Sequence, residues 1–185
     1  MGEPAISQPE PPPLSIEASV EAGAWPDEDR LAAIALDAVE AALGELDETL
    51  PPETELSLVF TDDRAIRVLN RDWRKKDKPT NVLSFPAPEP LPGVAMPASL
   101  GDIVLAFETV SREAEAENKG FDSHLTHLIV HGFLHLLGFD HEDDAEAEAM
   151  EAVERRVLAR LGIADPYAET DMNNGDALPA RRTER

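Results

Sequence analysis

Hydrophobic and polar residues alternate, or give way to short apolar runs, in four stretches of the chain. Both patterns are typical of β-strands, the first with one buried face and the second with two. Pro86 closes the third stretch, because proline cannot donate a hydrogen bond to a neighbouring strand. The predicted strands are residues 14–22, 55–60, 81–85 and 100–107.

Apolar residues spaced three and four positions apart predict five helices. Side chains that can cap a helix precede three of them: Asp27 the first, Thr61 or Asp62 the second, and Asp143 or Asp144 the last. The predicted helices are residues 28–46, about 62–73, 108–118, 123–137 and about 144–161.

Two of these helices carry most of the candidate chemistry. In the helix that ends near Trp73, the spacing predicts that Ile66, Leu69 and Trp73 face the core. The helix over 123–137 is apolar nearly all round, so we expect it to lie at the centre of the molecule.

The order of the elements indicates an α+β fold, since the four strands precede the last three helices. We predict a single domain over 14–167, in which about five helices pack on a small mixed four-stranded sheet and the central helix carries the histidines. The acidic, proline-rich segment 1–13 and the polar segment 168–185 are predicted to be disordered tails.

All five histidines of the chain lie between His124 and His141. His131 and His135 are four residues apart, so on a helix they project from one face. Gly138 can adopt the left-handed conformation that ends a helix, after which His141 can close a third corner. Three imidazoles leave one position of a tetrahedral metal open, which is typical of catalytic zinc.

The histidine spacing leaves one alternative open, because His127, His131 and His135 form a continuous row at intervals of four. His127 could therefore replace one ligand, but the turn at Gly138 favours the set His131, His135 and His141. His127 is then a neighbour of the ligands or a core residue, and His124 is expected to be solvated near the start of the helix.

Gly132 stands directly after the first histidine, where zinc proteases with this spacing carry a glutamate general base. Peptide hydrolysis by that route lacks its base here. Because glycine costs about 1 kcal/mol relative to alanine inside a helix, its presence also hints at a close approach by another backbone or a substrate.

The net charge of −22 argues against a nucleic-acid partner only at first sight, because the charge is unevenly distributed. Seven basic and two acidic residues between Arg64 and Lys78 give that segment a balance of +5 and leave −27 on the rest of the chain. Such a segment can focus a polyanion onto one site. An ordinary solvated helix face followed by a loop is the alternative.

The remaining composition bears on the compartment and on the metal ligands. There is no cysteine, so a transition metal must be bound by nitrogen and oxygen. The N-terminus lacks the layout of a signal peptide, and the longest apolar run, 128–139, is shorter than a membrane span. A soluble, cytoplasmic protein without a membrane partner is the prediction.

Three separated motifs resemble the YbeY family of endoribonucleases, which act in ribosomal RNA maturation and ribosome quality control. They are Lys-Pro-Thr-Asn-Val-Leu-Ser-Phe-Pro at 78–86, Leu-Gly-Asp-Ile-Val at 100–104 and His-Gly-Phe-Leu-His-Leu-Leu-Gly-Phe-Asp-His at 131–141. The resemblance covers about residues 14–167.

The resemblance implies a metal-dependent, single-strand-specific endoribonuclease in which His131, His135 and His141 bind one metal ion. The ion is expected to be zinc, although imidazole ligands also suit other divalent transition metals. The resemblance further implies a functional role for Arg74, which would stabilise the phosphate while the metal activates water. Ribosomal RNA, the small ribosomal subunit and ribosomal proteins are the implied partners.

Two competing functions remain at this point. A ribosome-assembly factor without catalysis would use the metal to fix its fold, and a metal-dependent protease would need a base other than Gly132. Asp140 is also open to two interpretations, either orienting a ligand histidine or capping the last helix.

Overall fold

The computed structural model describes residues 14–88 and 98–168, so most of the predicted tails and of the proline-rich segment 86–98 lie outside the described residues. All nine predicted elements are present. The four strands form one sheet in the order β1-β2-β4-β3, and β3 alone runs antiparallel to its neighbour, which confirms the mixed sheet. The strands are β1 (Leu14–Val20), β2 (Thr54–Thr61), β3 (Val82–Pro86) and β4 (Ser99–Ala106).

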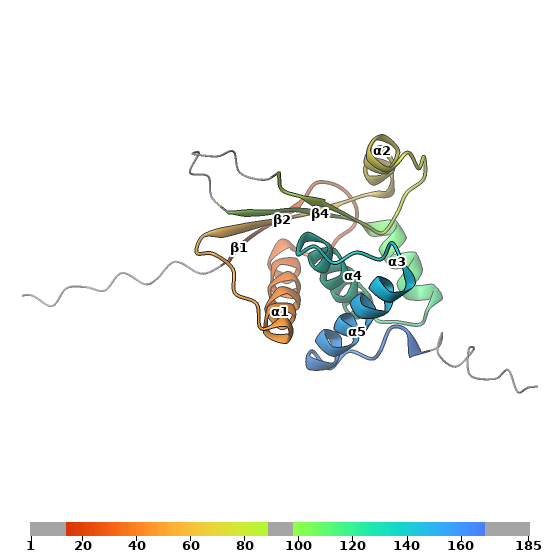
Figure 1. Ribbon diagram of the computed structural model, residues 1–185. Coiled ribbons are helices and arrows are strands. Elements are labelled where there is room, and N and C mark those ends of the chain that lie inside the picture. The colour runs from red at the N-terminus through yellow and green to blue at the C-terminus, as the bar shows by residue number, and fades with distance from the viewer. Residues whose placement is uncertain (1–13, 89–97, 169–185) are drawn as a thin grey trace, which may run out of the picture.

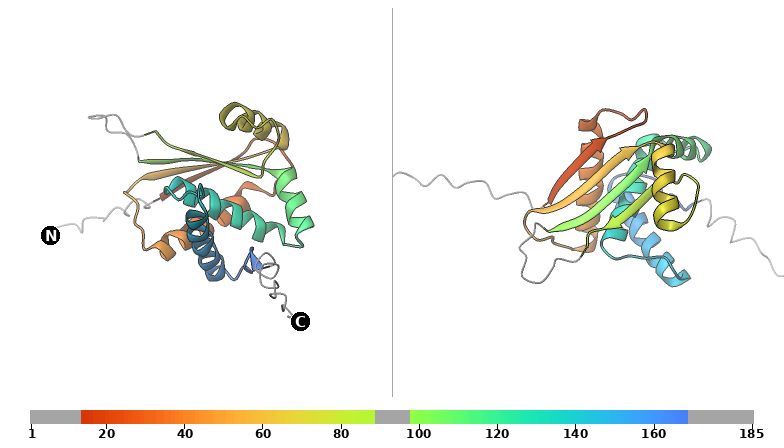
Figure 2. Two further views of the ribbon diagram at one scale, coloured as in Figure 1. Left: turned by 45° about the vertical axis from the view of Figure 1, so that its right-hand side comes forward. Right: turned by 90° about the horizontal axis from the view of Figure 1, so that it is seen from above.

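The helices lie on both faces of the sheet in unequal numbers (Figures 1 and 2). Four of them gather on one face, where α5 packs on α1 and α4 on the side away from the sheet. Only α2 lies on the opposite face. The helices are α1 (Glu28–Leu46), α2 (Asp63–Arg74), α3 (Phe107–Ala116), α4 (Phe121–Leu136) and α5 (Asp144–Arg160).

Three aspartates begin helices as the capping pattern predicts. Asp27 accepts a hydrogen bond from the backbone N–H of Arg30 at 3.0 Å, which satisfies one of the amides that an α-helix leaves free at its start. Asp62 and Asp143 do the same for α2 and α5. These caps explain why the predicted helix starts agree with the structure.

α4 is the centre of the core, as its apolar composition predicts. Leu125, Ile129 and Phe133 are fully buried and belong to one cluster with Leu58 and Ile103 of the sheet. Burying this cluster fixes the direction of α4 across the sheet, and therefore the side on which its histidines emerge.

The prediction for Trp73 is wrong. Its side chain is 70% exposed, and its ring meets Phe85 edge-on with 5.7 Å between the ring centres. The apolar cluster under α2 is small, and Ile66 and Leu69 already cover it. Trp73, in the last turn of α2, therefore projects past the cluster.

None of the helices within 14–88 and 98–168 is long and apolar enough to cross a membrane.

Candidate metal centre

A cavity of about 770 Å³ opens beside α4 and brings together segments that are far apart in the sequence. Its wall includes four histidines of α4, the start of β3 and residues 165–168, which follow α5. All four predicted site residues line it, namely Arg74, His131, His135 and His141.

His131, His135 and His141 converge on one point. Each offers a ring nitrogen, and these three nitrogens lie within 4.8 Å of one another. The Nε2 atoms of His131 and His135 are 3.1 Å apart, close to the roughly 3.3 Å that separates two imidazole nitrogens on a tetrahedral zinc ion. The donor set and its spacing therefore fit a metal ion.

The turn at Gly138 brings His141 to this point. Gly138 has a φ of +95°, and two backbone hydrogen bonds of 3.0 Å, from Gly138 to His135 and from Phe139 to Leu134, close the helix end as a Schellman motif. His141 follows on an exposed loop, whereas the other two histidines are half-buried on α4.

In His131 and His135, the ring nitrogen that faces away from the shared point already makes a hydrogen bond. The Nδ1–H of His131 donates to Glu154 Oε1 at 2.7 Å, and the Nδ1–H of His135 donates to the carbonyl oxygen of Phe139 at 2.9 Å. A neutral imidazole has one N–H, so both Nε2 lone pairs face the shared point. Burial and the nearby His131 lower the pKa of His135, which favours the neutral ring that a metal requires.

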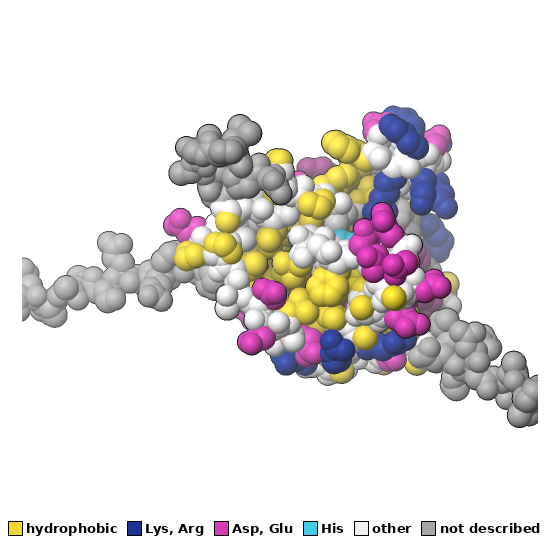
Figure 3. Space-filling model, in the orientation of Figure 1, with side chains coloured by type: hydrophobic (Ala, Val, Ile, Leu, Met, Phe, Trp, Pro, Cys, Tyr) yellow, Lys and Arg dark blue, Asp and Glu magenta, His cyan; other side chains and the backbone are white. Residues whose placement is uncertain are grey.

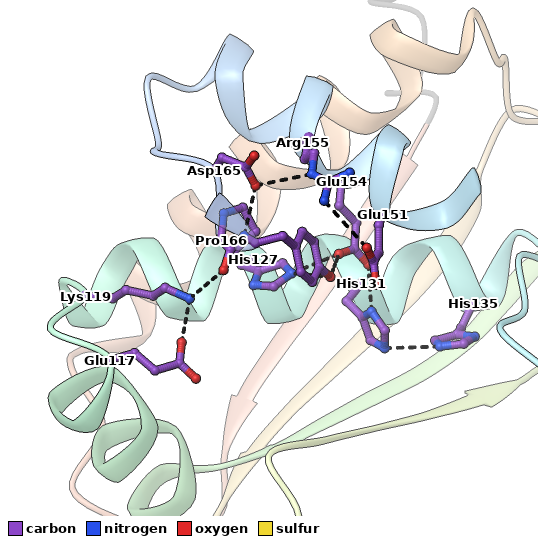
Figure 4. A network of polar contacts seen from close by, with 11 residues as sticks. Glu117, Lys119, His127, His131, His135, Glu151, Glu154, Arg155, Asp165 and Pro166 are labelled. Atoms are coloured by element: carbon purple, nitrogen blue, oxygen red, sulfur yellow. Dashed lines mark hydrogen bonds and ion pairs between the residues drawn. The ribbon is translucent and has the colours of Figure 1, made fainter. Parts of the chain in front are cut away.

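Glu154 of α5 is the important site residue that the sequence interpretation missed (Figure 4). It is fully buried, and its Oε2 accepts hydrogen bonds from His127 at 2.9 Å and from the Tyr167 hydroxyl. Burial alone would raise the pKa of Glu154, but the hydrogen bonds and positive charge of His127 and His131 lower it to about 2. The available signal was its place between Val153 and Val157 on the apolar stripe of a helix rich in glutamate.

His127, the rival ligand, points to Glu154 and to Tyr167, whose hydroxyl is 3.3 Å from its Nε2. It does not belong to the converging set. The prediction that His124 is solvated is wrong, since only 5% of it is exposed and its Nε2 lies 2.9 Å from Glu113 Oε2. A carboxylate on α3 faces His124 and replaces the water that the sequence led us to expect.

Arg74 is exposed at the end of α2 and lines the same cavity as the histidines. Its neighbours on the helix are paired, Arg67 with Asp77 and Arg71 with Asp72. Among the residues that the structure describes, no carboxylate lies within ion-pair distance of Arg74. Its charge is therefore available to an anion in the cavity.

Neither interpretation of Asp140 matches the contacts. Its Oδ1 accepts a hydrogen bond from the backbone N–H of His141 at 2.8 Å, and the cap of α5 is Asp143. By bonding this backbone N–H, the Asp140 side chain helps to fix the conformation of the loop that carries His141.

Gly132 explains how α4 comes so close to the sheet. A Cβ at this position would lie 3.0 Å from both Ile103 Cγ2 and Ser84 Oγ, and Ser84 Oγ donates to the Gly132 carbonyl at 3.0 Å. The close approach that the glycine hinted at is made by side chains of β3 and β4. Asn81, just before β3, is linked to α3 instead, since its Nδ2 donates to Glu113 Oε2 at 3.0 Å.

Charge on the surface follows the uneven sequence distribution. Dark-blue side chains gather over α2, at the upper right of Figure 3, and acidic side chains lie below them. The ion pairs of Arg67 and Arg71 neutralise part of this basic surface. Arg74 is the residue of this surface that lines the cavity, and exposed lysines follow it in the sequence.

Known proteins resemble this chain over most of its length. The family model described as Endoribonuclease YbeY matches residues 18–162. A protein of Rhizobium meliloti (strain 1021) named Endoribonuclease YbeY is 55% identical over 161 residues, which cover 84% of this chain and 96% of the relative. A protein of the same name from Azorhizobium caulinodans is 57% identical over 155 residues, with 84% and 97% of the two chains covered. The match confirms the resemblance seen in the three motifs, and this chain belongs to the endoribonuclease YbeY family.

Proposed function

We propose that this protein is a metal-dependent, single-strand-specific endoribonuclease that acts in ribosomal RNA maturation and ribosome quality control. The observation that carries the proposal is one cavity lined by three converging imidazoles and by Arg74, which has no carboxylate partner within residues 14–88 and 98–168. Membership of a family named for endoribonuclease activity supports the same reaction.

In this proposal His131 and His135, through Nε2, and His141 hold one zinc ion. When bound, zinc supplies a Lewis acid that polarises a phosphoryl oxygen and lowers the pKa of water. Arg74 binds the scissile phosphate and stabilises the negative charge that gathers there in the transition state.

The carboxylates of the cavity support this division of roles. Of the carboxylates that line it, Glu113 accepts hydrogen bonds from Asn81 and His124. Glu117 is paired with Lys119, and Asp165 with Arg155. Gly132 removes the glutamate that zinc proteases use. Among the residues that the structure describes, the carboxylates lining the cavity are therefore engaged by other groups, whereas Arg74 has no carboxylate partner, which suits cleavage of a phosphodiester better than of a peptide.

The size of the cavity supports a preference for single strands. A volume of about 770 Å³ is in the range of sites for small ligands and admits a single nucleotide rather than a duplex. A phosphodiester in an unpaired segment, where bases can splay out, suits a cavity of this size better than one in a duplex. The basic surface on α2 would hold the flanking phosphates, and ribosomal RNA in the small subunit is the proposed partner.

The test compares wild-type protein, metal-depleted protein and Arg74→Ala on a labelled single-stranded fragment of 16S ribosomal RNA. Arg74→Ala should lose about 10²- to 10³-fold in kcat, the usual effect of removing one group that stabilises transition-state charge, and should keep its zinc. Metal-depleted protein should not cut until zinc is restored.

Arg71→Ala is the matched control, because Arg71 lies on the same helix but is paired with Asp72. It should cut at nearly the wild-type rate. RNA that binds normally and is never cut by wild-type protein would support the alternative, an assembly factor with a structural metal. Wild-type rates for both Arg74→Ala and metal-depleted protein would contradict the mechanism.

A further inference from the structure

Glu154 is unusual because it places a full negative charge in the apolar interior. It is 0% exposed and lies on the buried stripe of α5 with Val153, Val157 and Leu158. Burying a carboxylate is costly unless it is paired and hydrogen-bonded. Hydrogen bonds to both of its oxygens offset this cost, and they indicate the role of the carboxylate.

The two oxygens of Glu154 have separate tasks. Oε1 accepts from His131 Nδ1 at 2.7 Å, and Oε2 accepts from His127 Nε2 at 2.9 Å and from the Tyr167 hydroxyl. The contacts on Oε2 prevent the carboxylate from turning, so Oε1 stays directed at His131.

The contact with Oε1 selects one tautomer of His131. Because a carboxylate only accepts hydrogen bonds, it holds the single proton of the neutral ring on Nδ1 and leaves the Nε2 lone pair for a cation. His135 receives the same assistance from a backbone carbonyl. Because Glu154 acts through its side chain, a substitution there can change the tautomer of His131 without removing a metal ligand.

Tyr167 reaches Glu154 because the segment after α5 folds back over the cavity. The carbonyl of Pro166 accepts from Lys119 Nζ at 3.2 Å, and the backbone N–H of Tyr167 donates to Asp165 Oδ1 at 2.9 Å. The Arg155 guanidinium lies 5.1 Å from the centre of the Tyr167 ring. Burial and the Glu154 carboxylate raise the pKa of Tyr167, so its hydroxyl stays a donor.

We propose that Glu154 is a positioning residue of the metal centre, which fixes His131 in the tautomer that directs Nε2 to the metal, and that Tyr167 holds Glu154 in that orientation. The inference rests on the proposed metal centre and concerns metal affinity rather than the cleavage step. It makes residues 165–168, which follow α5, part of the surroundings of the metal site, although only His131, His135 and His141 converge among the described residues.

The experiment measures zinc affinity by competition with a chromogenic chelator for wild type, Glu154→Met, Glu154→Gln and Tyr167→Phe. Methionine matches the size of glutamate but accepts no strong hydrogen bond, so Glu154→Met should bind zinc 10- to 100-fold more weakly. Glutamine keeps one acceptor oxygen, so the zinc affinity of Glu154→Gln should lie between those of Glu154→Met and wild type. The zinc affinity of Tyr167→Phe should lie in the same interval. Glu148→Met removes the same charge from an exposed position of α5 and should bind zinc as wild type does.

A second measurement separates positioning from a merely structural role. In metal-free protein at pH 8, long-range ¹H–¹⁵N spectra of the imidazoles should show the His131 proton on Nδ1 in wild type and largely on Nε2 in Glu154→Met. If Glu154→Met does not fold, the affinity and tautomer of Tyr167→Phe decide the question.

The outcomes distinguish this inference from the proposed function. Wild-type zinc affinity, within twofold, together with an unchanged tautomer in Glu154→Met would overturn the role of Glu154 and leave the metal centre standing. Wild-type protein that binds no zinc, or binds it equally well after His131→Ala, would overturn the metal centre and this inference with it.

Discussion

Glu113 shows how a single carboxylate organises the wall of the cavity. Burial would raise its pKa, but hydrogen bonds from His124 and Asn81 outweigh burial and lower it. A carboxyl whose pKa is lower in the folded state stabilises the fold above its unfolded pKa, here 4.5, and loses that contribution as the pH falls through the folded value.

We expect Glu113→Gln to lower the free energy of unfolding by about 1 kcal/mol at pH 7, because a neutral amide accepts weaker hydrogen bonds than a carboxylate. The difference from wild type should shrink as the pH falls below about 4.5 and disappear once Glu113 is protonated in both states. Urea unfolding of metal-free protein between pH 3 and 7 measures it.

The control is Glu115→Gln, at an exposed position of the same helix. Its stability difference from wild type should be near zero and flat over this range. A difference for Glu113→Gln that persists unchanged at low pH would contradict the assignment of the charge to this contact.

At the residue scale, the sequence predicted which histidines converge better than it predicted the hydrogen-bond partners of the histidines. Spacing selected His131, His135 and His141, and the structure brings these three together. The same spacing could not distinguish His124 from a solvated residue or find Glu154. The hydrogen-bond partners of His124 and Glu154 lie outside their own helices. The spacing of residues within one helix does not show which glutamate of another helix faces a given histidine.

At the scale of elements, two helical glycines give opposite predictions. A Cβ at Gly132 would lie 3.0 Å from atoms on two strands, one of them in the fully buried Ile103. A Cβ at Gly44 of α1 would meet only the end of the flexible Arg160 side chain, also at 3.0 Å.

We expect Gly132→Ala to destabilise the fold by about 1 kcal/mol, since overpacking costs about 1–3 kcal/mol and exceeds the gain in helix propensity. Gly44→Ala should stabilise it by about 0.5–1 kcal/mol, because Arg160 can move aside. Chemical denaturation of both variants without metal gives the two values. Equal stabilisation by both would show that α4 is free to shift away from the sheet.

The elements themselves were largely predictable, whereas their arrangement was not. The predicted first helix, 28–46, agrees with α1, and the predicted strands agree with the structure within about two residues. The order β1-β2-β4-β3 depends on pairing between distant segments, which alternation does not encode. The prediction for Trp73 failed for a related reason. The extent of the apolar surface under α2 depends on the arrangement of the strands, which the helical spacing of Trp73 does not encode.

At the scale of the whole molecule, the uneven charge should control association with RNA. The chain is strongly acidic, yet the segment 64–78 carries a local balance of +5. A polyanion is therefore attracted at α2 and repelled over much of the remaining surface.

We expect the double variant Lys75→Gln and Lys76→Gln to bind single-stranded RNA more weakly and with a flatter dependence of log Kd on log salt concentration. The slope should decrease by about 1.4, since each of the two phosphate contacts on a single strand contributes about 0.7. Fluorescence anisotropy between 50 and 300 mM KCl measures it.

Arg156→Gln with Arg160→Gln removes as much charge from α5, where both arginines pair with Glu45. This control should keep the wild-type slope. Equal effects of the two double variants would mean that net charge alone, and not the α2 surface, governs binding.

The loop that begins at Gly138 has a consequence for how fast the metal exchanges. His131 and His135 are held on a packed helix by hydrogen bonds to their second nitrogens, while His141 sits on an exposed loop. In the proposed metal centre, an ion would be released first by His141, on the exposed loop, and only then by the pair held on α4. The loop that carries His141 would then govern the first step of metal release, whereas the buried carboxylate behind His131 would govern the geometry of the pair that remains.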